Sequence, residues 1–398
     1  MRYDFDRIID RRNTNSVKWD QNEKLFGVEE ILDMWVADMD FPCPEPVMEA
    51  LRRRLDHPVF GYTFPPESLY QAVVDRMERY YGWQVEKEWV VFAPGVVNAL
   101  HASVTALTDP GDQVILQSPV YYPFFAAIRD NGCQVVNNQL VYDGRGTYTM
   151  DLEGLREHFA VEGGFPGRSH RIKALILCSP HNPVGRVWTP EELSGLAEIC
   201  LEHDCAILSD EIHADLLVGD QGHTATATLS PQVAERTITL MAPSKSFNLA
   251  GLHASFVVIP NSDWRRRFLQ AWTGKVSVNT LGLVAMEAAL RHGDDYLNQL
   301  NAYLRGNVEY FMDRVARIPG IEAVRPQGTY LIWVDMRDLG MDDRELRHFM
   351  IHEVGVAADF GYIFGPGGEG FQRFNLGCPR AYVEAALDSL EEALAGRS

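Results

Sequence analysis

The sequence has no apolar run that approaches the ~20 residues a membrane-spanning helix requires, so no such helix is expected. Its first residues, MRYDFDRIIDRRN, mix both signs of charge around no apolar core and are not expected to act as a secretory signal. The six cysteines form no CxxC pair, and several lie within apolar runs, as small buried side chains do. These absences favour a protein of the reducing cytoplasm.

Basic residues are also scarce, because 36 Lys and Arg face 55 Asp and Glu, for a net charge of −19. Nucleic-acid binding depends on clustered positive charge, so a nucleic-acid partner is excluded. The sequence contains no internal repeat and no low-complexity tract. Its 398 residues, 46% hydrophobic and 23% charged, are typical of a globular enzyme with about two or three domains.

Short β-rich runs alternate with helical patterns from about residue 89 to residue 290, which predicts crossover units on a mainly parallel sheet. Between two of these runs, Thr189 to Glu192 has the pattern of an N-cap, a first-turn proline and a capping box. The helix that starts there is expected to run to about His203. The expected strands are residues 89–94, 113–118, 173–179, 205–211, 237–244 and 254–260.

The C-terminal part of the chain predicts a smaller unit. Beyond Asp294, apolar residues recur every three or four positions from Leu297 to Ile318, which predicts a long helix that links two domains. The first ~45 residues have too little pattern to fold alone and are expected to pack on the smaller unit. We therefore predict a large domain of residues 48–290 and a small α+β domain of residues 1–47 and 291–398. Beyond the long helix, the small domain should alternate strand and helix over residues 329–336, 343–354, 371–377 and 382–394.

Polar residues stand where expected strands begin or end, and ligands of open parallel sheets bind beyond the carboxyl ends of strands. Lys245 has such a place, among the small residues of APSKSFNLAGL (242–252). A lysine there can lose its proton and form a Schiff base, although an ordinary surface lysine would also fit the sequence. A buried aspartate there needs a cation or donor, which the pyridinium nitrogen of pyridoxal would supply. The asparagine of the Asn-Pro-x-Gly turn could equally belong to a simple turn. The four residues are Asn182, Asp210, Lys245 and Arg373.

Other features suit a phosphorylated aromatic cofactor and an amino acid bound to it. Gly95, Val96 and Val97 lie at a strand-to-helix junction, where free backbone amides suit a phosphate. Tyr121 offers an aromatic face for the ring, or is a plain core residue. The fork of Arg373 matches a carboxylate in two hydrogen bonds, which would hold the substrate Cα–H bond perpendicular to the ring.

Motifs around these residues are similar to those of the fold type I pyridoxal-phosphate enzymes of the aminotransferase class I/II superfamily. They are N-P-x-G, D-E-x-H, S-K-S-F and the late R-x-N. Within that superfamily the chain resembles the cystathionine β-lyase branch, also called cysteine-S-conjugate β-lyases. The matching segments are NSVKWD (15–20), MWVADMDF (34–41), FGYT (60–63), SPHNPVGRVW, SDEIHADL, SKSFNLAGL and RFNLGCPR.

The resemblance covers essentially the whole chain and implies both a fold and a set of roles. The fold is an α/β large domain, whose mainly parallel, mixed seven-stranded sheet is sandwiched by helices, plus a smaller α+β domain. Lys245 would be the Schiff-base lysine and catalytic base, Asp210 would hold the pyridine nitrogen, and Tyr121 would stack on the ring as a third catalytic residue. Asn182 would donate to the ring 3′-oxygen, and Arg373 would bind the substrate α-carboxylate.

The phosphate side departs from the commoner aminotransferase pattern, because Ala242 replaces a Ser or Thr and His253 replaces an arginine. His213 stands where many aminotransferases have a tyrosine, as is usual in the β-lyase branch, and favours a lyase. Tyr62 would reach the phosphate from the neighbouring subunit of a homodimer. The expected cofactor contacts are Tyr62, Gly95, Val96, Val97, Tyr121, Asn182, Asp210, His213, Ser244, Lys245 and His253, and the expected substrate contacts are Arg373, Asn182 and Ala37.

A metal site is a competing interpretation, through the acids and histidine of residues 210–215 or through His348 and His352 one helical turn apart. Side chains alternate along a strand, so Glu211 and His213 are each expected to face away from Asp210. The acids and histidine of residues 210–215 would then not converge on one metal ion. The helical pair lacks a third ligand. We therefore expect no metal.

These observations predict a homodimeric pyridoxal-phosphate carbon–sulfur β-lyase that cleaves cystathionine or other S-substituted L-cysteines to a thiol, pyruvate and ammonia. An aminotransferase with the same cofactor is the main alternative. A second alternative is a regulatory binding protein on the same fold. The presence of Lys245, Asp210, Asn182 and Arg373 together argues against it, because a protein without catalysis would not need all four. The preferred S-substituent stays open, because loops 35–41 and 360–370 carry no specificity code.

Overall fold

The computed structural model describes residues 2–160 and 171–397. Its largest element is a seven-stranded sheet in the order β2-β10-β9-β8-β7-β3-β4. All neighbours pair in parallel except β10, which is antiparallel to β2 and β9. The mainly parallel, mixed sheet is the predicted one. Its strands are β2 (Val90–Ala93), β10 (Ser255–Val258), β9 (Thr237–Met241), β8 (Ala206–Asp210), β7 (Ile172–Cys178), β3 (Gln113–Leu116) and β4 (Gln134–Asn137).

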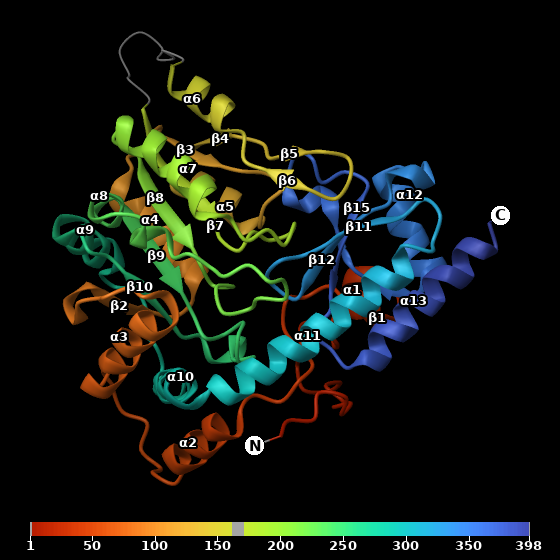
Figure 1. Cartoon of the computed structure of the whole chain (residues 1–398). Coiled ribbons are helices and arrows are strands. Elements are labelled where there is room, and N and C mark those ends of the chain that lie inside the picture. Colours follow the sequence, from red (N-terminus) through yellow and green to blue (C-terminus); the bar gives the residue numbers. More distant parts are fainter. Residues whose placement is uncertain (1, 161–170, 398) are drawn as a thin grey trace.

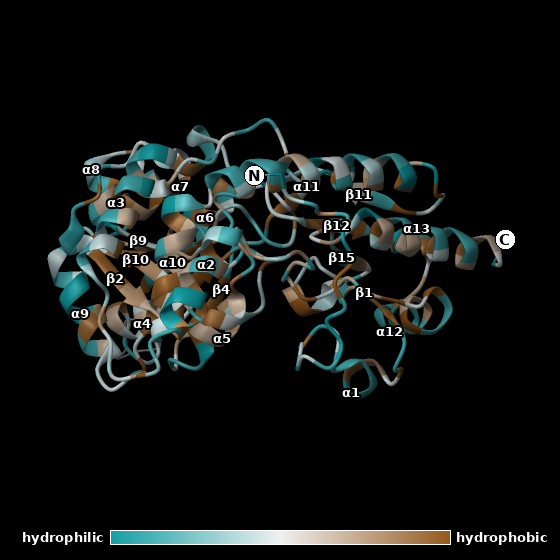
Figure 2. Ribbon diagram, turned by 90° about the horizontal axis from the view of Figure 1, so that it is seen from below, coloured by the Kyte–Doolittle hydropathy of each residue, from teal (hydrophilic) through white to brown (hydrophobic). Residues whose placement is uncertain are grey.

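Helices cover both faces of this sheet (Figure 1). Successive residues of its central strands face opposite sides. In β7, Ala174 and Ile176 pack in one apolar cluster with the first helix layer, and Leu175 and Leu177 pack in another with the second layer. Figure 2 shows hydrophobic colour on the inner strands and hydrophilic colour along the outer side of α9. The first layer is α4 (Val96–Leu107), α5 (Pro123–Arg129) and α9 (Ser262–Trp272), and the second is α6 (Leu152–Ala160), α7 (Pro190–Glu202) and α8 (Pro231–Glu235).

The predicted capping box at Thr189 and Glu192 is present and starts helix α7 of the second layer. Three further helices lie beside the large sheet. Helices α3 (Glu67–Tyr81) and α10 (Thr280–His292) enclose an apolar cluster with β2 and β10, and α2 (Glu45–Leu55) packs on α10.

A second, smaller sheet has the order β11-β12-β15-β14. The long helix α11 (Asp294–Val315) runs along this unit beside α13 (Arg380–Ala395), as Figure 1 shows. The predicted helix over 343–354 is α12 (Asp343–His348) followed by a π-helical turn (Phe349–Val354). The strands are β11 (Glu322–Val324), β12 (Leu331–Asp335), β15 (Phe371–Asn375) and β14 (Asp359–Phe360).

The N-terminal segment packs on this smaller unit, where Figure 1 shows its red trace among blue elements. After the short helix α1 (Asn22–Phe26), strand β1 (Leu32–Asp33) pairs in parallel with β13 (Val356–Ala357), and Phe5 lies in the same apolar core as α11. The domain boundaries at 47/48 and 290/291 stay a prediction.

A two-stranded hairpin, β5 (Val141–Tyr142) and β6 (Tyr148–Thr149), completes the set of strands. No helix of the described residues is long and apolar enough to cross a membrane.

Candidate active site

A cavity of about 350 Å³ opens at the carboxyl ends of β7, β8 and β9, where a parallel sheet places its ligands. Eleven of the thirteen residues predicted from the sequence line it, although they come from segments more than two hundred positions apart. They are Ala37, Gly95, Val96, Val97, Tyr121, Asn182, Asp210, His213, Ser244, Lys245 and His253.

Lys245 follows the buried strand β9 and points across the cavity. Its Nζ donates a hydrogen bond of 2.6 Å to the carbonyl of Ala37. Burial and, secondarily, the charge of Arg373 lower the pKa of Lys245 to about 8. An amine of this pKa is neutral in a substantial fraction of molecules near neutral pH, as a nucleophile or general base must be.

Asp210 is the last residue of β8 and is 4% exposed. Its Oδ1 accepts one hydrogen bond, of 3.2 Å, from the backbone of Ile212. Burial raises the pKa of this carboxyl to about 7, and the nearby Lys245 opposes the rise. No ion pair joins Asp210 to any cation of residues 2–160 or 171–397, so a buried carboxylate here lacks the partner that its burial calls for.

The position of His213 corrects the expectation from strand alternation, which turned it away from Asp210, because His213 lines the same cavity as Asp210. It lies among the other expected cofactor contacts. Strand β8 ends at Asp210, and the next residues turn, with the amide of Ala214 bonded to the carbonyl of Glu211. The alternation of a strand therefore stops before His213. Burial lowers the pKa of His213 well below its ordinary value, and its Nδ1 has no hydrogen-bond partner among the described residues.

The neighbouring acids point away from the cavity, as predicted for Glu211. Its carboxylate accepts hydrogen bonds from Ser209, Thr226 and His223. Asp215 pairs with Arg76 and accepts from Tyr81 and Ser246. Within the described ranges, no three acidic, histidine or cysteine residues are placed to hold a metal ion.

Arg373, on β15, does not line the cavity but reaches its wall. Its Nη1 donates a hydrogen bond of 2.9 Å to Oδ1 of Asn182, and Nη2 donates to the carbonyl of Trp35 at 3.0 Å. Nη2 also donates to the carboxylate of Asp359. Tyr121 adjoins this group, since its amide donates to the carbonyl of Asn182 at 3.1 Å.

The opposite end of the cavity is built for an anion. Gly95, at a φ of 113° that favours glycine, turns the chain from β2 into α4. The first amides of a helix have no partner within it, so those of Val96 and Val97 can bind an anion at the positive helix end. Ser244 and His253 lie at the cavity wall, His253 with a φ of 48°.

Tyr62 is the predicted residue that lies apart from the cavity. It is fully exposed within a loop that also exposes Val59, Phe60 and Phe64. A lone protomer gives Tyr62 no route to the site.

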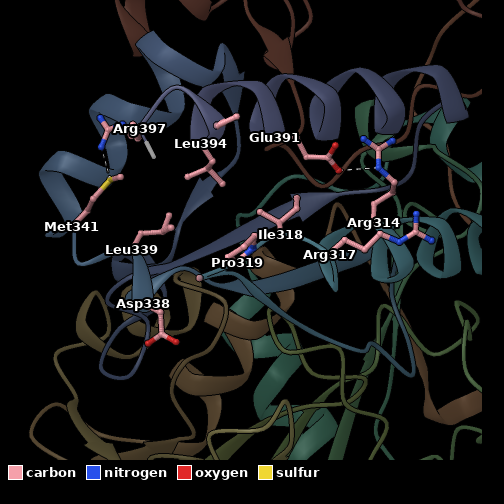
Figure 3. A pocket seen from close by; sticks show the side chains of 12 residues that line it. Arg314, Arg317, Ile318, Pro319, Asp338, Leu339, Met341, Glu391, Leu394 and Arg397 are labelled. Carbon is pink, nitrogen blue, oxygen red and sulfur yellow. Dashed lines mark hydrogen bonds and ion pairs between the residues drawn. The ribbon is translucent and has the colours of Figure 1, made fainter.

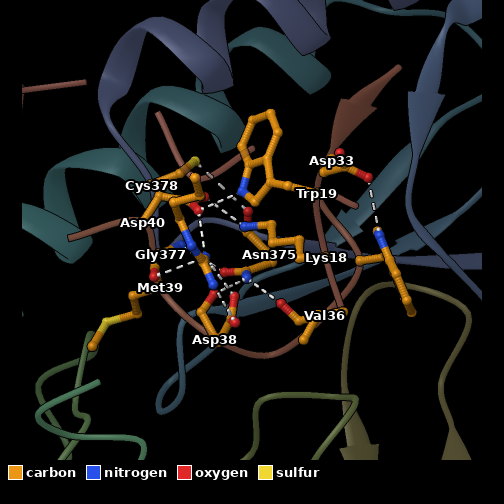
Figure 4. Close-up of polar contacts among 12 residues, drawn as sticks. Lys18, Trp19, Asp33, Val36, Asp38, Met39, Asp40, Asn375, Gly377 and Cys378 are labelled. Atoms are coloured by element: carbon orange, nitrogen blue, oxygen red, sulfur yellow. Dashed lines mark hydrogen bonds and ion pairs between the residues drawn. The ribbon is translucent and has the colours of Figure 1, made fainter. Parts of the chain in front are cut away.

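Residues 34–41, here called the N-terminal strap, border the cavity at Ala37 and are held in place by polar contacts (Figure 4). Asn375 donates to the carbonyls of Val36 and Asp38, and Tyr330 donates to the carbonyl of Ala37 at 2.8 Å. Tyr330, Trp35 and Asp359 were not predicted as site residues. Trp35 lies within the MWVADMDF segment but was given no role, and none of the matching segments contains Tyr330 or Asp359.

The strap is anchored at Asp40, which is 2% exposed. Its carboxylate accepts from Lys18 at 2.5 Å, from Arg11 at 2.7 Å and from Nε1 of Trp19 at 3.0 Å. Lys18 is fully buried. The NSVKWD and MWVADMDF segments therefore meet in one buried charge cluster.

A larger hollow of about 930 Å³ lies near the carboxyl ends of α11 and α13 (Figure 3). Among its lining residues, Arg314 is bonded to Glu391 at 2.9 Å. None of the predicted site residues lines it.

Known proteins match nearly the whole chain. The family model described as Aminotransferase class I and II matches residues 29–390. Cystathionine beta-lyase PatB of Bacillus subtilis (strain 168) is 41% identical over 395 residues, which are 98% of this chain and 99% of that protein.

Solved structures also match nearly the whole chain. The structure of cystalysin from Treponema denticola, which contains a pyridoxal 5′-phosphate cofactor, superposes with a TM-score of 0.94 at 37% identity and covers 100% of both chains. The PLP-bound C-S lyase from Staphylococcus hominis has a TM-score of 0.90 at 34% identity and covers 99% of this chain and 98% of that one. The resemblance seen in the sequence motifs is thus confirmed, and the chain belongs to the aminotransferase class I and II family.

Proposed function

We propose that this chain is a pyridoxal-phosphate-dependent carbon–sulfur β-lyase that cleaves cystathionine or other S-substituted L-cysteines to a thiol, pyruvate and ammonia. The motifs of the cystathionine β-lyase branch support the activity. So do the full-length relatives, which include a cystathionine beta-lyase at 41% identity and a C-S lyase at 34% identity.

The fit of the cofactor is carried by one observation. Asp210 is a buried carboxylate that forms no ion pair within the described residues, and it shares its cavity with Lys245, whose pKa is lowered to about 8. A pyridinium nitrogen would pair with Asp210, and Lys245 would attach the aldehyde. The amides at the start of α4, with Ser244 and His253, would hold the phosphate. Tyr121 would stack on the ring. Asn182 would contact the 3′-oxygen, and the unpartnered Nδ1 of His213 would face the same cofactor.

The substrate would be held by the other wall. Arg373 would bind its α-carboxylate beside Asn182, and Ala37 of the strap would cover it. Bound pyridoxal phosphate supplies an electron sink for the charge left at Cα. Lys245 would take the Cα proton on Nζ, so that the carbon–sulfur bond can release the thiolate from Cβ.

A second copy of the chain completes this proposal. Tyr62, Phe60 and Phe64 are exposed aromatic residues of one loop, as an interface loop would present them. Tyr62 would reach the phosphate of the partner's site in a homodimer. All six cysteines are unpaired, which supports a cytoplasmic location.

The test is incubation of the cofactor-loaded protein with L-cystathionine and no keto acid, while pyruvate and free thiol are measured together. Equal amounts of both products support the β-lyase, and Lys245→Ala protein serves as the inactive control. Amino transfer that appears only with an added keto acid would instead identify an aminotransferase. Silence in both assays would favour the regulatory binding protein.

A further inference from the structure

The hydrogen bonds of Arg373 leave its guanidinium only partly available. Nη2 donates to two acceptors, the carbonyl of Trp35 and the carboxylate of Asp359. Nη1 donates to Asn182, and the buried Nε has no hydrogen-bond partner within the described residues. Both hydrogens of Nη2 are therefore in use, while Nε and Nη1 each keep one free.

An arginine can bind a carboxylate through two parallel hydrogen bonds in two geometries, and both geometries use Nη2. The end-on grip uses Nη1 and Nη2, and the side-on grip uses Nε and the neighbouring Nη2. The two hydrogens that are free do not lie side by side. A substrate carboxylate can therefore form two parallel bonds only after one acceptor leaves Nη2.

Asp359 is the acceptor that can leave. The carbonyl of Trp35 belongs to the backbone beside residues that Asn375 and the small sheet hold in place. Asp359 stands directly opposite Arg373 in the pairing of β14 with β15, and its side chain is 12% exposed against 3% for Arg373. Apart from Arg373, no side-chain hydrogen bond of Asp359 is found in the described chain. Burial also leaves the carboxylate of Asp359 poorly solvated, which raises its pKa.

We propose that Asp359 occupies the place of the substrate α-carboxylate on Arg373 and has to leave it when substrate binds. Asp359 then sets the affinity for amino-acid substrates by competing inside the protein for one guanidinium. The proposal rests on the proposed function, in which Arg373 binds the α-carboxylate. A different role, in which Asp359 only positions Arg373, predicts the opposite effect of its removal.

The probe is 3-(methylthio)propanoate, which has the carboxylate and thioether of S-methylcysteine but no amine to react with the cofactor. Its dissociation constant is measured by calorimetry on the cofactor-loaded wild type and on Asp359→Asn. We expect about tenfold tighter binding in the variant, the factor that corresponds to one hydrogen bond to a charged group. Asp359→Ser removes the same charge with a smaller side chain and should show the same gain.

Asp388→Asn is the matched control, because Asp388 also pairs with an arginine, Arg314, at 2.8 Å, but is 68% exposed on α13. It should leave the dissociation constant unchanged. Unchanged or weaker binding in both Asp359 variants would overturn the proposal. Pyruvate release from S-methylcysteine by the wild type is followed in parallel: its absence refutes the proposed lyase, whereas its presence with no gain in the variants refutes only the role of Asp359.

Discussion

The buried ion pair between Lys18 and Asp40 should be a large single contribution to the stability of the N-terminal segment. Lys18 is fully buried and Asp40 is 2% exposed, with Nζ and Oδ2 2.5 Å apart. Lys18→Met keeps most of the side-chain volume but leaves Asp40 with Arg11 and Trp19 alone. Breaking such a pair from one side costs ~3–5 kcal/mol, and the two remaining donors place the expected loss near ~3 kcal/mol.

The assay is thermal unfolding followed by circular dichroism, with the first transition as the readout, because a chain of this size need not unfold in one step. A loss of that size lowers the transition by on the order of 5 °C or more. Arg12→Met is the matched control, since Arg12 and Asp10 also pair but are 65% and 64% exposed, and it should not shift the transition. Lys18→Met with Asp40→Leu should recover part of the loss. Equal melting of Lys18→Met and Arg12→Met would refute the reasoning.

Three further outcomes concern the active site. Cofactor-free protein should recapture pyridoxal phosphate faster as pH rises through about 8, because the amine of Lys245 then loses its proton; a rate independent of pH between 7 and 9 would contradict that pKa. Arg373→Lys should raise KM by the equivalent of ~1.5–3 kcal/mol, and an unchanged KM would remove Arg373 from the substrate site. Asp210→Asn should lower kcat by roughly 10²–10³-fold, because an amide cannot hold the ring nitrogen protonated, whereas full activity would separate Asp210 from the cofactor.

The strands of the large sheet could be predicted because their apolar runs are continuous and bounded by turns. The convergence of Asn182, Asp210 and Lys245 followed from the same pattern, since parallel strands bring their carboxyl ends to one edge. Strand β4 gave no comparable signal, because its four residues, Gln134–Asn137, are half-buried or exposed at the sheet edge. Strand alternation placed His213 on the wrong side because the sequence does not show where the strand ends and the turn begins.

The contacts around Arg373 could not be predicted for a different reason. Asp359 meets Arg373 through a strand of two residues, β14, which is too short for any periodic pattern. The carbonyls of Trp35 and Ala37 accept hydrogen bonds without any side-chain requirement, so residue types reveal nothing of them. Only the pairing of distant segments brings these groups together.

The strap links the stability of the N-terminal segment to the chemistry of the site. Asp40, anchored by Lys18, lies three residues from Ala37, whose carbonyl accepts from Lys245. Burial is the main cause of the lowered pKa of Lys245, and a loosened strap would admit water to its amine. Lys18→Met should therefore shift the pH midpoint of cofactor recapture upward from about 8, whereas Arg12→Met should leave it in place. A destabilised Lys18→Met protein with an unshifted midpoint would show that the charge cluster stabilises the fold without affecting the pKa of the Lys245 amine.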